Sequence, residues 1–181
     1  MERIEIMLAT NHDVALRQFE IDDIPLKVAW INDPQVHRYL HYDLPLDLEK
    51  TRNWFLKKDN TSREDLVILY RGTPVGLIGL LQIDSVNRKA EFYISIGETS
   101  LYRSGIGSQA SLLLLRHAFC ERNLHKVYLN VDADNIAAIS MYEKLGFRKE
   151  GVFHDDLLRG TQYVDRVRYA IFAGNIRADL M

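Results

Sequence analysis

The chain has 181 residues, enough for one domain whose hydrophobic core needs no disulfide or metal to be stable. Hydrophobic residues make up 47% and charged residues 27%, which is ordinary for a soluble globular protein. The 23 Lys and Arg residues nearly balance the 25 Asp and Glu residues, and the formal net charge is −2. This balance argues against a general nucleic-acid-binding protein, which needs a basic surface. We therefore expect a single domain over residues 1–181 and no nucleic-acid partner.

Other compositional features narrow the class further. The one cysteine, Cys120, excludes an internal disulfide and fits a reducing compartment. The six histidines lack zinc-site spacing. Residues 1–6 lack the apolar stretch of a signal peptide, and the longest apolar run, 112–115, is far shorter than a membrane span. We expect no metal, no membrane partner and a cytoplasmic location.

The N-terminal half contains all four prolines, which predicts a more interrupted chain there. Three aspartates stand where helix N-caps are expected: Asp23 after Asp22, Asp33 before a proline, and Asp47. The elements predicted in this half are a strand over 14–19, a helix ending near 32, a helix over 47–58, and strands over 65–71 and 75–83.

The C-terminal half begins with a strand over 89–96, which continues an antiparallel meander from the two strands before it. Gly146 is predicted to be the left-handed C-cap of a helix over 135–145, in which Ile136, Ile139 and Tyr142 take apolar positions. The other elements predicted are a helix over 105–121 and strands over 125–131, 152–158 and 163–172. One sheet with these helices is an α+β, or mixed α/β, fold.

A glycine-rich turn joins the strand at 89–96 to the following helix. Gly105 and Gly107 allow positive φ and close approach of a ligand, and the helix start offers free N–H groups and the positive end of its dipole. These features suit a pyrophosphate, with Arg103 and Ser104 as added contacts. A plain strand-to-helix turn is the alternative. A Walker A loop and a dinucleotide fingerprint are excluded, because the Gly-Lys-Ser/Thr and the third glycine are absent.

The helix over 135–145 carries two polar-tipped residues, Asn135 and Tyr142, on similar sides and two turns apart. The alternative to a functional role is that Asn135 caps the helix and Tyr142 is a core residue whose hydroxyl has a partner.

Together the two segments resemble the GNAT family of N-acetyltransferases, in the branch with ribosomal-protein N-terminal, spermidine and aminosugar enzymes. The resemblance runs from about 65 to 172 and is carried by Ala90–Ile96, Tyr102–Gly107, Asn123–Val131 and Asp134–Phe147. It implies a central, mostly antiparallel sheet of about seven strands, with the fourth and fifth splayed apart, flanked by about four helices. The loop departs from the family pattern: Tyr102 replaces Gln/Arg, Arg103 replaces Gly and Ser104 replaces Lys.

The resemblance also implies acetyl-CoA as co-substrate. Main-chain groups after the splay pair with the pantetheine arm, the glycine-rich loop binds the pyrophosphate, and Asn135 binds the pantetheine amide or holds a neighbouring loop. The acetyl-CoA-binding residues expected are Ile94, Ser95, Ile96, Tyr102, Arg103, Ser104, Gly105, Ile106, Gly107, Ser108 and Asn135.

The implied reaction is direct attack of a neutral amine on the thioester. Tyr142 is the expected general acid, which protonates the leaving thiolate. Glu91 is the candidate base, and the alternative is a solvated or paired residue of the sheet. Cys120 is expected to be buried beside Phe119 and not to act as a nucleophile.

Acceptor specificity in this family comes from the first helices, their loop and the final hairpin. Arg38, His41 and Tyr42 in this loop fit a nucleotide-linked aminosugar, with Arg38 reading an anionic group. A polyamine, bound by Asp43, Asp47 and Glu49, and a protein N-terminus are the alternatives, and so is a solvated surface. A non-catalytic acetyl-CoA-binding module on the same fold is the other class. The partner expected is a small-molecule amine, and the oligomeric state stays open, a homo-oligomer included.

Overall fold

The structure is a computed structural model that describes residues 8–9 and 13–175. The segment 1–6, where no signal peptide is expected, lies outside these residues. The chain divides into two compact units, one ending at Leu81 and resuming over Tyr93–Leu114, the other formed by Gln82–Phe92 and the chain from Leu115 onward. The single domain expected over 1–181 stays a prediction.

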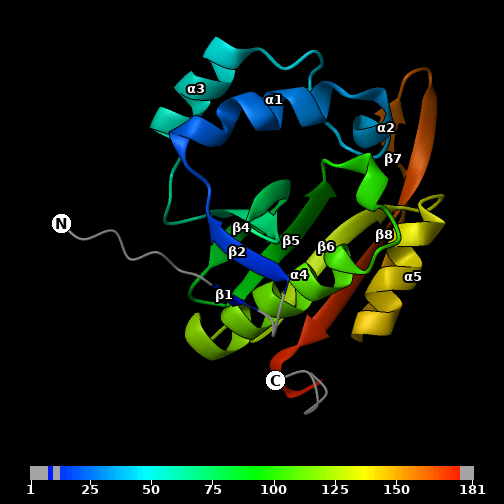
Figure 1. Cartoon of the computed structure of the whole chain (residues 1–181). Helices are drawn as coiled ribbons and strands as arrows, with labels where there is room; N and C mark the ends of the chain where they lie inside the picture. The colour runs from blue at the N-terminus through cyan, green and yellow to red at the C-terminus, as the bar shows by residue number, and fades with distance from the viewer. Residues whose placement is uncertain (1–7, 10–12, 176–181) are drawn as a thin grey trace. The chain divides into compact units, whose positions relative to one another are not determined.

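The first unit contains an antiparallel array of strands. Its hydrogen-bonding order is β1-β2-β3-β4, and Leu16 lies opposite Ile68 while Val67 lies opposite Leu77 (Figure 1). These four residues are almost wholly buried, as β-branched and leucine side chains on a pleated surface favour. The strands span Leu8–Ala9 (β1), Val14–Gln18 (β2), Glu64–Tyr70 (β3) and Thr73–Asp84 (β4).

Glycines on β4 let the chain approach closely within this unit. A Cβ on Gly76 would lie 2.4 Å from the carbonyl oxygen of Ser95, and a Cβ on Gly79 would lie 2.1 Å from that of Glu64. Ser95 belongs to β5 (Lys89–Ile96), which is followed by Gly97, whose N–H donates to the Val75 carbonyl at 2.8 Å. Larger side chains at these glycines would therefore push the backbones apart.

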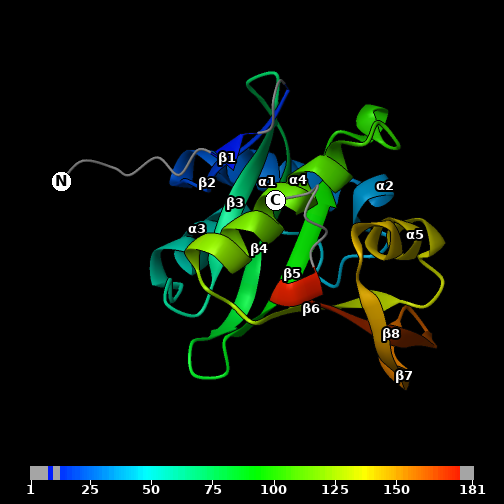
Figure 2. The ribbon, with the colours of Figure 1, turned by 90° about the horizontal axis from the view of Figure 1, so that it is seen from below.

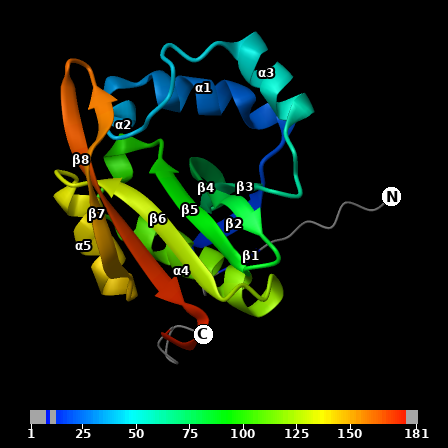
Figure 3. The same ribbon diagram turned by 180° about the vertical axis from the view of Figure 1, so that it is seen from behind.

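Helices α1 (Ile24–Asn32), α2 (Pro34–His37) and α3 (Leu48–Lys57) follow β2, and α1 and α3 lie side by side in Figures 1 and 3. Asp33 and Asp47 cap α2 and α3 as predicted, accepting from the N–H groups of Gln35 and Lys50 at 2.8 and 2.9 Å. Asp23 stands at the N-cap of α1, but its carboxylate turns back to the Glu20 N–H and to Arg17, so it does not cap this helix. The ion pair with Arg17 explains the difference.

The helix predicted over 105–121 is α4 (Ile106–Arg116) continued by a π-helical turn over His117–Glu121. Cys120 lies in this turn and is exposed, which corrects the expectation that it is buried. The wider turn changes the helical phase, so that His117, Ala118 and Phe119 face inward and Cys120 faces outward.

The second unit holds the first half of β5, with β6 (Lys126–Asp132), β8 (Gln162–Phe172) and β7 (Arg148–Arg159) beside it in that order. β6 is parallel to β5 and antiparallel to β8, and β7 and β8 form the closing hairpin, the orange-to-red pair in Figure 3. Both final strands begin earlier than predicted: β7 begins at Arg148 and β8 at Gln162.

Helix α5 (Ile136–Leu145) lies alongside β7 and β8 in Figures 1 and 2. Gly146 ends it with φ of +99°, the left-handed C-cap that the sequence predicted. Tyr142, Leu145 and Phe147 are buried, but Ile136 is 68% exposed, because the first turn of α5 extends beyond the core.

The mixed α and β composition and the order of elements confirm the predicted fold class, and β1 is among the short elements that the sequence did not indicate. Among residues 8–9 and 13–175, no helix has the length and apolar character needed to cross a membrane.

Candidate active site

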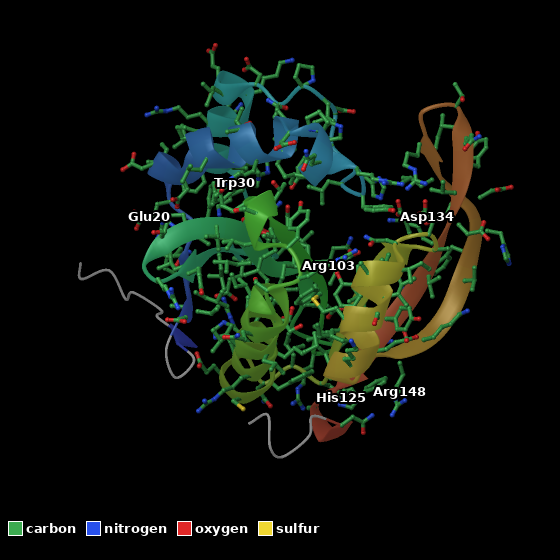
Figure 4. The ribbon with its side chains drawn as sticks, turned by 45° about the vertical axis from the view of Figure 1, so that its right-hand side comes forward. Glu20, Trp30, Arg103, His125, Asp134 and Arg148 are labelled. Carbon is green, nitrogen blue, oxygen red and sulfur yellow. The ribbon has the colours of Figure 1, made fainter. Side chains whose placement is uncertain are left out.

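The glycine-rich turn carries two residues in the left-handed region: Gly105 with φ of +87° and Arg103 with φ of +63°. Gly107 lies inside α4 and has no positive φ, so only part of the conformational prediction is right. A glycine fits at the Arg103 position without strain, which explains why the family usually has one there. Figure 4 labels Arg103 in this turn, beside the start of α4.

The first turn of α4 presents main-chain donors. The N–H groups of Ile106, Gly107 and Ser108 have no acceptor among the described residues. Ser104 turns its hydroxyl to the Leu101 carbonyl at 2.6 Å, and Tyr102 donates to the Ile96 carbonyl at 3.3 Å. These two side chains therefore shape the loop, and the free N–H groups with the helix dipole remain for an anion.

The pairing between β5 and β6 is short. It covers Lys89–Glu91 and Lys126–Tyr128, whereas β5 continues to Ile96 and β6 to Asp132. Ile94, Ser95 and Ile96 are half-buried. The parallel pairing therefore ends before either strand does.

Tyr142 lies on α5 with 7% of its surface exposed. Its ring packs edge-on against Phe92 and Phe147, with centroids 5.9 and 5.7 Å away. No hydrogen bond joins the hydroxyl to a described residue, and its oxygen is not among the enclosed polar atoms without a partner, so it reaches the surface. Burial raises the pKa of Tyr142, which keeps its proton in place at neutral pH.

Asn135 caps α5: its side-chain oxygen accepts from the Ala138 N–H at 3.3 Å. Helix capping is the structural role that the sequence analysis gave as the alternative for Asn135. The side-chain amide nitrogen makes no hydrogen bond to a described residue. A cap and a ligand contact from the amide nitrogen are therefore compatible.

Glu91 is half-buried on β5 and accepts a 2.9 Å hydrogen bond from the side-chain nitrogen of Asn130 on β6. The Asn130 oxygen in turn accepts from Nε of Arg168 on β8 at 3.1 Å. Since Nε only donates, the amide must face Arg168 with its oxygen and Glu91 with its NH₂ group. Glu91 is therefore an acceptor in this chain of bonds, as an ionised carboxylate is.

Sequence reasoning missed Asn130 and Arg168. The Arg168 guanidinium lies 4.7 Å from the Tyr128 ring and 5.2 Å from the Phe153 ring, which fixes its plane. The sequence signal for Asn130 was the alternation in the strand over 125–131. The buried valines and leucine define one face of this strand, and Tyr128 and Asn130 lie on the other. No sequence signal pointed to Arg168, because the register of β6 and β8 decides its position opposite Asn130.

The acceptor loop places Arg38, His41 and Tyr42 at exposed positions. The Arg38 guanidinium lies 5.2 Å from the adjacent Tyr39 ring and forms no ion pair with a described carboxylate, Asp33 and Asp43 included. The positive charge of Arg38 therefore has no carboxylate partner among the described residues. Tyr42 lies against Lys27 of α1, with the ammonium 5.8 Å from its ring centroid.

A buried charge cluster that the sequence did not indicate lies beneath α1 and α3. Asp65 on β3 accepts from Lys58, from Arg63 and from the Tyr93 hydroxyl. Burial opposes ionisation of Asp65, but the hydrogen bonds and charges of Arg63 and Lys58 dominate and lower its pKa to about 2.

In the described chain, no group of three or more His, Cys, Asp and Glu residues is arranged to hold a metal.

The comparisons with known proteins agree with this fold. The model of the acetyltransferase (GNAT) domain family matches residues 13–148. The chain therefore belongs to the GNAT acetyltransferase family, and it is an N-acetyltransferase that uses acetyl-CoA.

Its relatives include spermidine acetyltransferases. A spermidine N(1)-acetyltransferase of Escherichia coli (strain K12) is 33% identical over 168 residues, covering 91% of this chain and 89% of that protein. The corresponding enzyme of Vibrio cholerae is 31% identical and covers 89% and 94%. The spermidine N-acetyltransferase of Vibrio cholerae solved with CoA and spermine has a TM-score of 0.80 and 26% identity, covering 90% of this chain and 96% of that chain.

Proposed function

We propose that the chain acetylates the primary amine of a small-molecule acceptor by direct attack on acetyl-CoA, with Tyr142 as general acid and Glu91 as general base. One observation carries the catalytic part. The Tyr142 ring is held by Phe92 and Phe147, yet its hydroxyl has no partner among the described residues. The hydroxyl oxygen is not among the enclosed polar atoms that lack a partner, so it reaches the surface and can donate to a substrate atom such as the leaving sulfur.

The role of Glu91 as general base is supported by its hydrogen bond from Asn130. An ammonium acceptor must lose a proton before it attacks, and an ionised carboxylate accepts that proton directly or through water. Asn130 donates to one Glu91 oxygen and leaves the other without a hydrogen bond to a described residue. The hydrogen bond that pairs Glu91 within the sheet thus also orients it.

The residues of the loop fit the anionic end of acetyl-CoA. The free N–H groups of Ile106, Gly107 and Ser108 bind the pyrophosphate together with the main chain of the preceding turn, residues 102–105. The main chain of Ile94–Ile96 pairs with the pantetheine amides. Asn135 adds a donor from its amide nitrogen.

For the acceptor we propose an aminosugar that carries an anionic group. The supporting observation is the uncompensated charge of Arg38, because a fixed cation repels a polyamine: at 4 Å and an effective dielectric near 20 the repulsion is on the order of 4 kcal/mol. A polyamine is the second candidate, supported by the relatives that act on spermidine.

Release of CoA thiol from acetyl-CoA, measured across an amine panel, tests the proposal. The panel holds spermidine, a UDP-aminosugar and peptides that begin with Ala or Ser, each with wild type and Arg38→Ala. We expect the UDP-aminosugar to be the best acceptor and Arg38→Ala to lower its rate selectively. Faster acetylation of spermidine, unchanged by Arg38→Ala, would assign the chain to polyamines. No amine-dependent release in the panel would contradict the proposed function as a whole.

A further inference from the structure

Lys27 on α1 is a buried cation, with 7% of its surface exposed. Its ammonium lies 3.8 Å from the centroid of the Trp54 ring, and the rings of Phe19 and Tyr42 lie 5.6 and 5.8 Å away. No described residue forms an ion pair or a hydrogen bond with this ammonium, and its nitrogen is not among the enclosed polar atoms without a partner, so a solute can reach it. Cation–π attraction thus replaces only part of the hydration that the ammonium loses.

The nearest carboxylate is already saturated. One oxygen of Asp65 accepts from Lys58 at 3.0 Å and from Nε of Arg63 at 2.9 Å. The other accepts from Arg63 at 2.7 Å and from the Tyr93 hydroxyl at 2.8 Å. Four donors fill the lone pairs of a carboxylate, so Asp65 cannot also bond Lys27.

All three cations gather around one indole ring. The charged groups of Lys27, Arg63 and Lys58 lie 3.8, 4.7 and 5.7 Å from the centroid of Trp54. Among the described residues whose charges act on Lys27, Arg63 and Lys58 are positive and Asp65 is negative. Burial lowers the pKa of Lys27, the charge of Asp65 raises it, and the charges of Arg63 and Lys58 lower it, which together bring it to about 8.

We propose that these residues, Lys27, Trp54, Lys58, Arg63 and Asp65, form a binding site for an oxyanion of the acceptor, a phosphate or a carboxylate. The inference rests on the proposed function, whose acceptor it describes more closely. An oxyanion balances the excess positive charge and supplies the hydrogen-bond acceptor that Lys27 lacks. The Arg63 side chain is 25% exposed and Tyr42 is 38% exposed, so the cluster reaches the surface.

Protonation of Lys27 should be linked to binding. The cluster binds an anion most tightly with Lys27 charged, so the affinity is constant below about pH 7 and falls as the pH rises past 8. Beyond that point the fall approaches tenfold per pH unit until the pKa of the bound state is reached. Tyr42 and Tyr93 face the same cluster, and desolvation of their hydroxyls with the charge of Asp65 raises the pKa of each, so they keep their protons over this range.

Sulfate is the probe of choice because its charge does not change between pH 6 and 10. Its affinity for the full-length chain, without acetyl-CoA, is measured by calorimetry and by tryptophan fluorescence, to which Trp30 and Trp54 both contribute. We expect Lys27→Met to weaken sulfate at least tenfold at pH 7 and to abolish the pH dependence. Lys57→Met, on the exposed side of α3, is the matched control and leaves both unchanged. Methyl phosphate and acetate, compared at pH 7, then distinguish a phosphate from a carboxylate site.

Equal sulfate affinity in wild type and Lys27→Met, or a wild-type affinity that does not fall above pH 8, overturns the proposal. The second result needs no variant. Neither measurement involves turnover, so the two proposals fail separately: CoA release with an amine but no Lys27-dependent sulfate binding removes only the oxyanion site. Lys27-dependent binding without any amine acetylation removes the enzyme function.

Discussion

The side-chain amide of Asn130 joins Glu91, at 2.9 Å, to Arg168, at 3.1 Å, across three neighbouring strands. Because an arginine cannot accept a hydrogen bond, Arg168 donates to Asn130 and Asn130 donates to Glu91, so the carboxylate is the final acceptor. A glutamate held in this way has a fixed orientation, which a base needs and a solvated residue of the sheet lacks. The first prediction follows from this relationship.

Glu91→Gln should lower kcat/KM at pH 7 by about 10²–10⁴-fold, the usual contribution of a general base. The deficit should shrink at high pH, where the acceptor amine loses its proton unaided. Asn130→Leu should lower kcat/KM by less than Glu91→Gln does, because the carboxylate stays in place and loses only the donor that orients it. The profiles of both variants are compared with that of Asn53→Leu, an exposed control on α3. A Glu91→Gln profile that parallels wild type assigns Glu91 to structure alone.

Tyr142→Phe should reduce turnover by roughly 10–10³-fold while leaving acetyl-CoA binding nearly intact. The ring keeps its packing against Phe92 and Phe147, and only the hydroxyl that protonates the thiolate is lost. Single-turnover rates and calorimetry with CoA separate the two effects. Unchanged turnover in a chemistry-limited assay would remove Tyr142 from the acid role.

Gly107→Val should weaken CoA binding and leave the chain folded. A β-branched side chain in the first turn of α4 stands where a pyrophosphate approaches the free N–H groups. Calorimetry with CoA gives the affinity, and Gly151→Val serves as control because nothing lies within 4 Å of a Cβ there. Equal affinity in Gly107→Val and wild type means that the loop is a plain turn.

Gly97→Ala should destabilise the fold by about 1–3 kcal/mol, the usual cost of overpacking. An added Cβ would lie 2.2 Å from the Trp30 ring, which is buried and held by a 3.0 Å hydrogen bond to Glu98 (Figure 4 labels Trp30 below α1). Urea denaturation measures the loss. Gly174→Ala, where a Cβ meets open space, should stay within about 0.5 kcal/mol of wild type.

Asp65→Asn should cost about 3–5 kcal/mol, because Lys58 and Arg63 are left without their buried counterion. The pKa of Asp65 is about 2 in the folded chain, below its value of about 3.9 in an unfolded chain. Its contribution to stability is therefore full above about pH 4 and is lost as the pH falls toward 2. Urea denaturation from pH 2 to 7 checks this, and Asp13→Asn, in an exposed pair with Arg71, should change stability by less than about 1 kcal/mol.

The sequence by itself determined the secondary structure and the two motifs of the site. Helix caps such as Asp33 and Asp47, the left-handed Gly146 and the alternation of β6 are local signals, and local hydrogen bonds and φ angles decide them. Cys120 shows where local reading fails: a π-helical turn shifts the phase of the helix and exposes it.

Only the tertiary structure decided which distant residues meet. Arg168 faces Asn130 through the register of β6 and β8, and Lys27, Lys58 and Arg63 gather around Trp54 from α1 and the chain after α3. These residues carry no motif, because their positions depend on strand register and helix packing rather than on spacing along the chain. Periodicity fixes which face of an element a side chain takes, and the packing of that face fixes its partners.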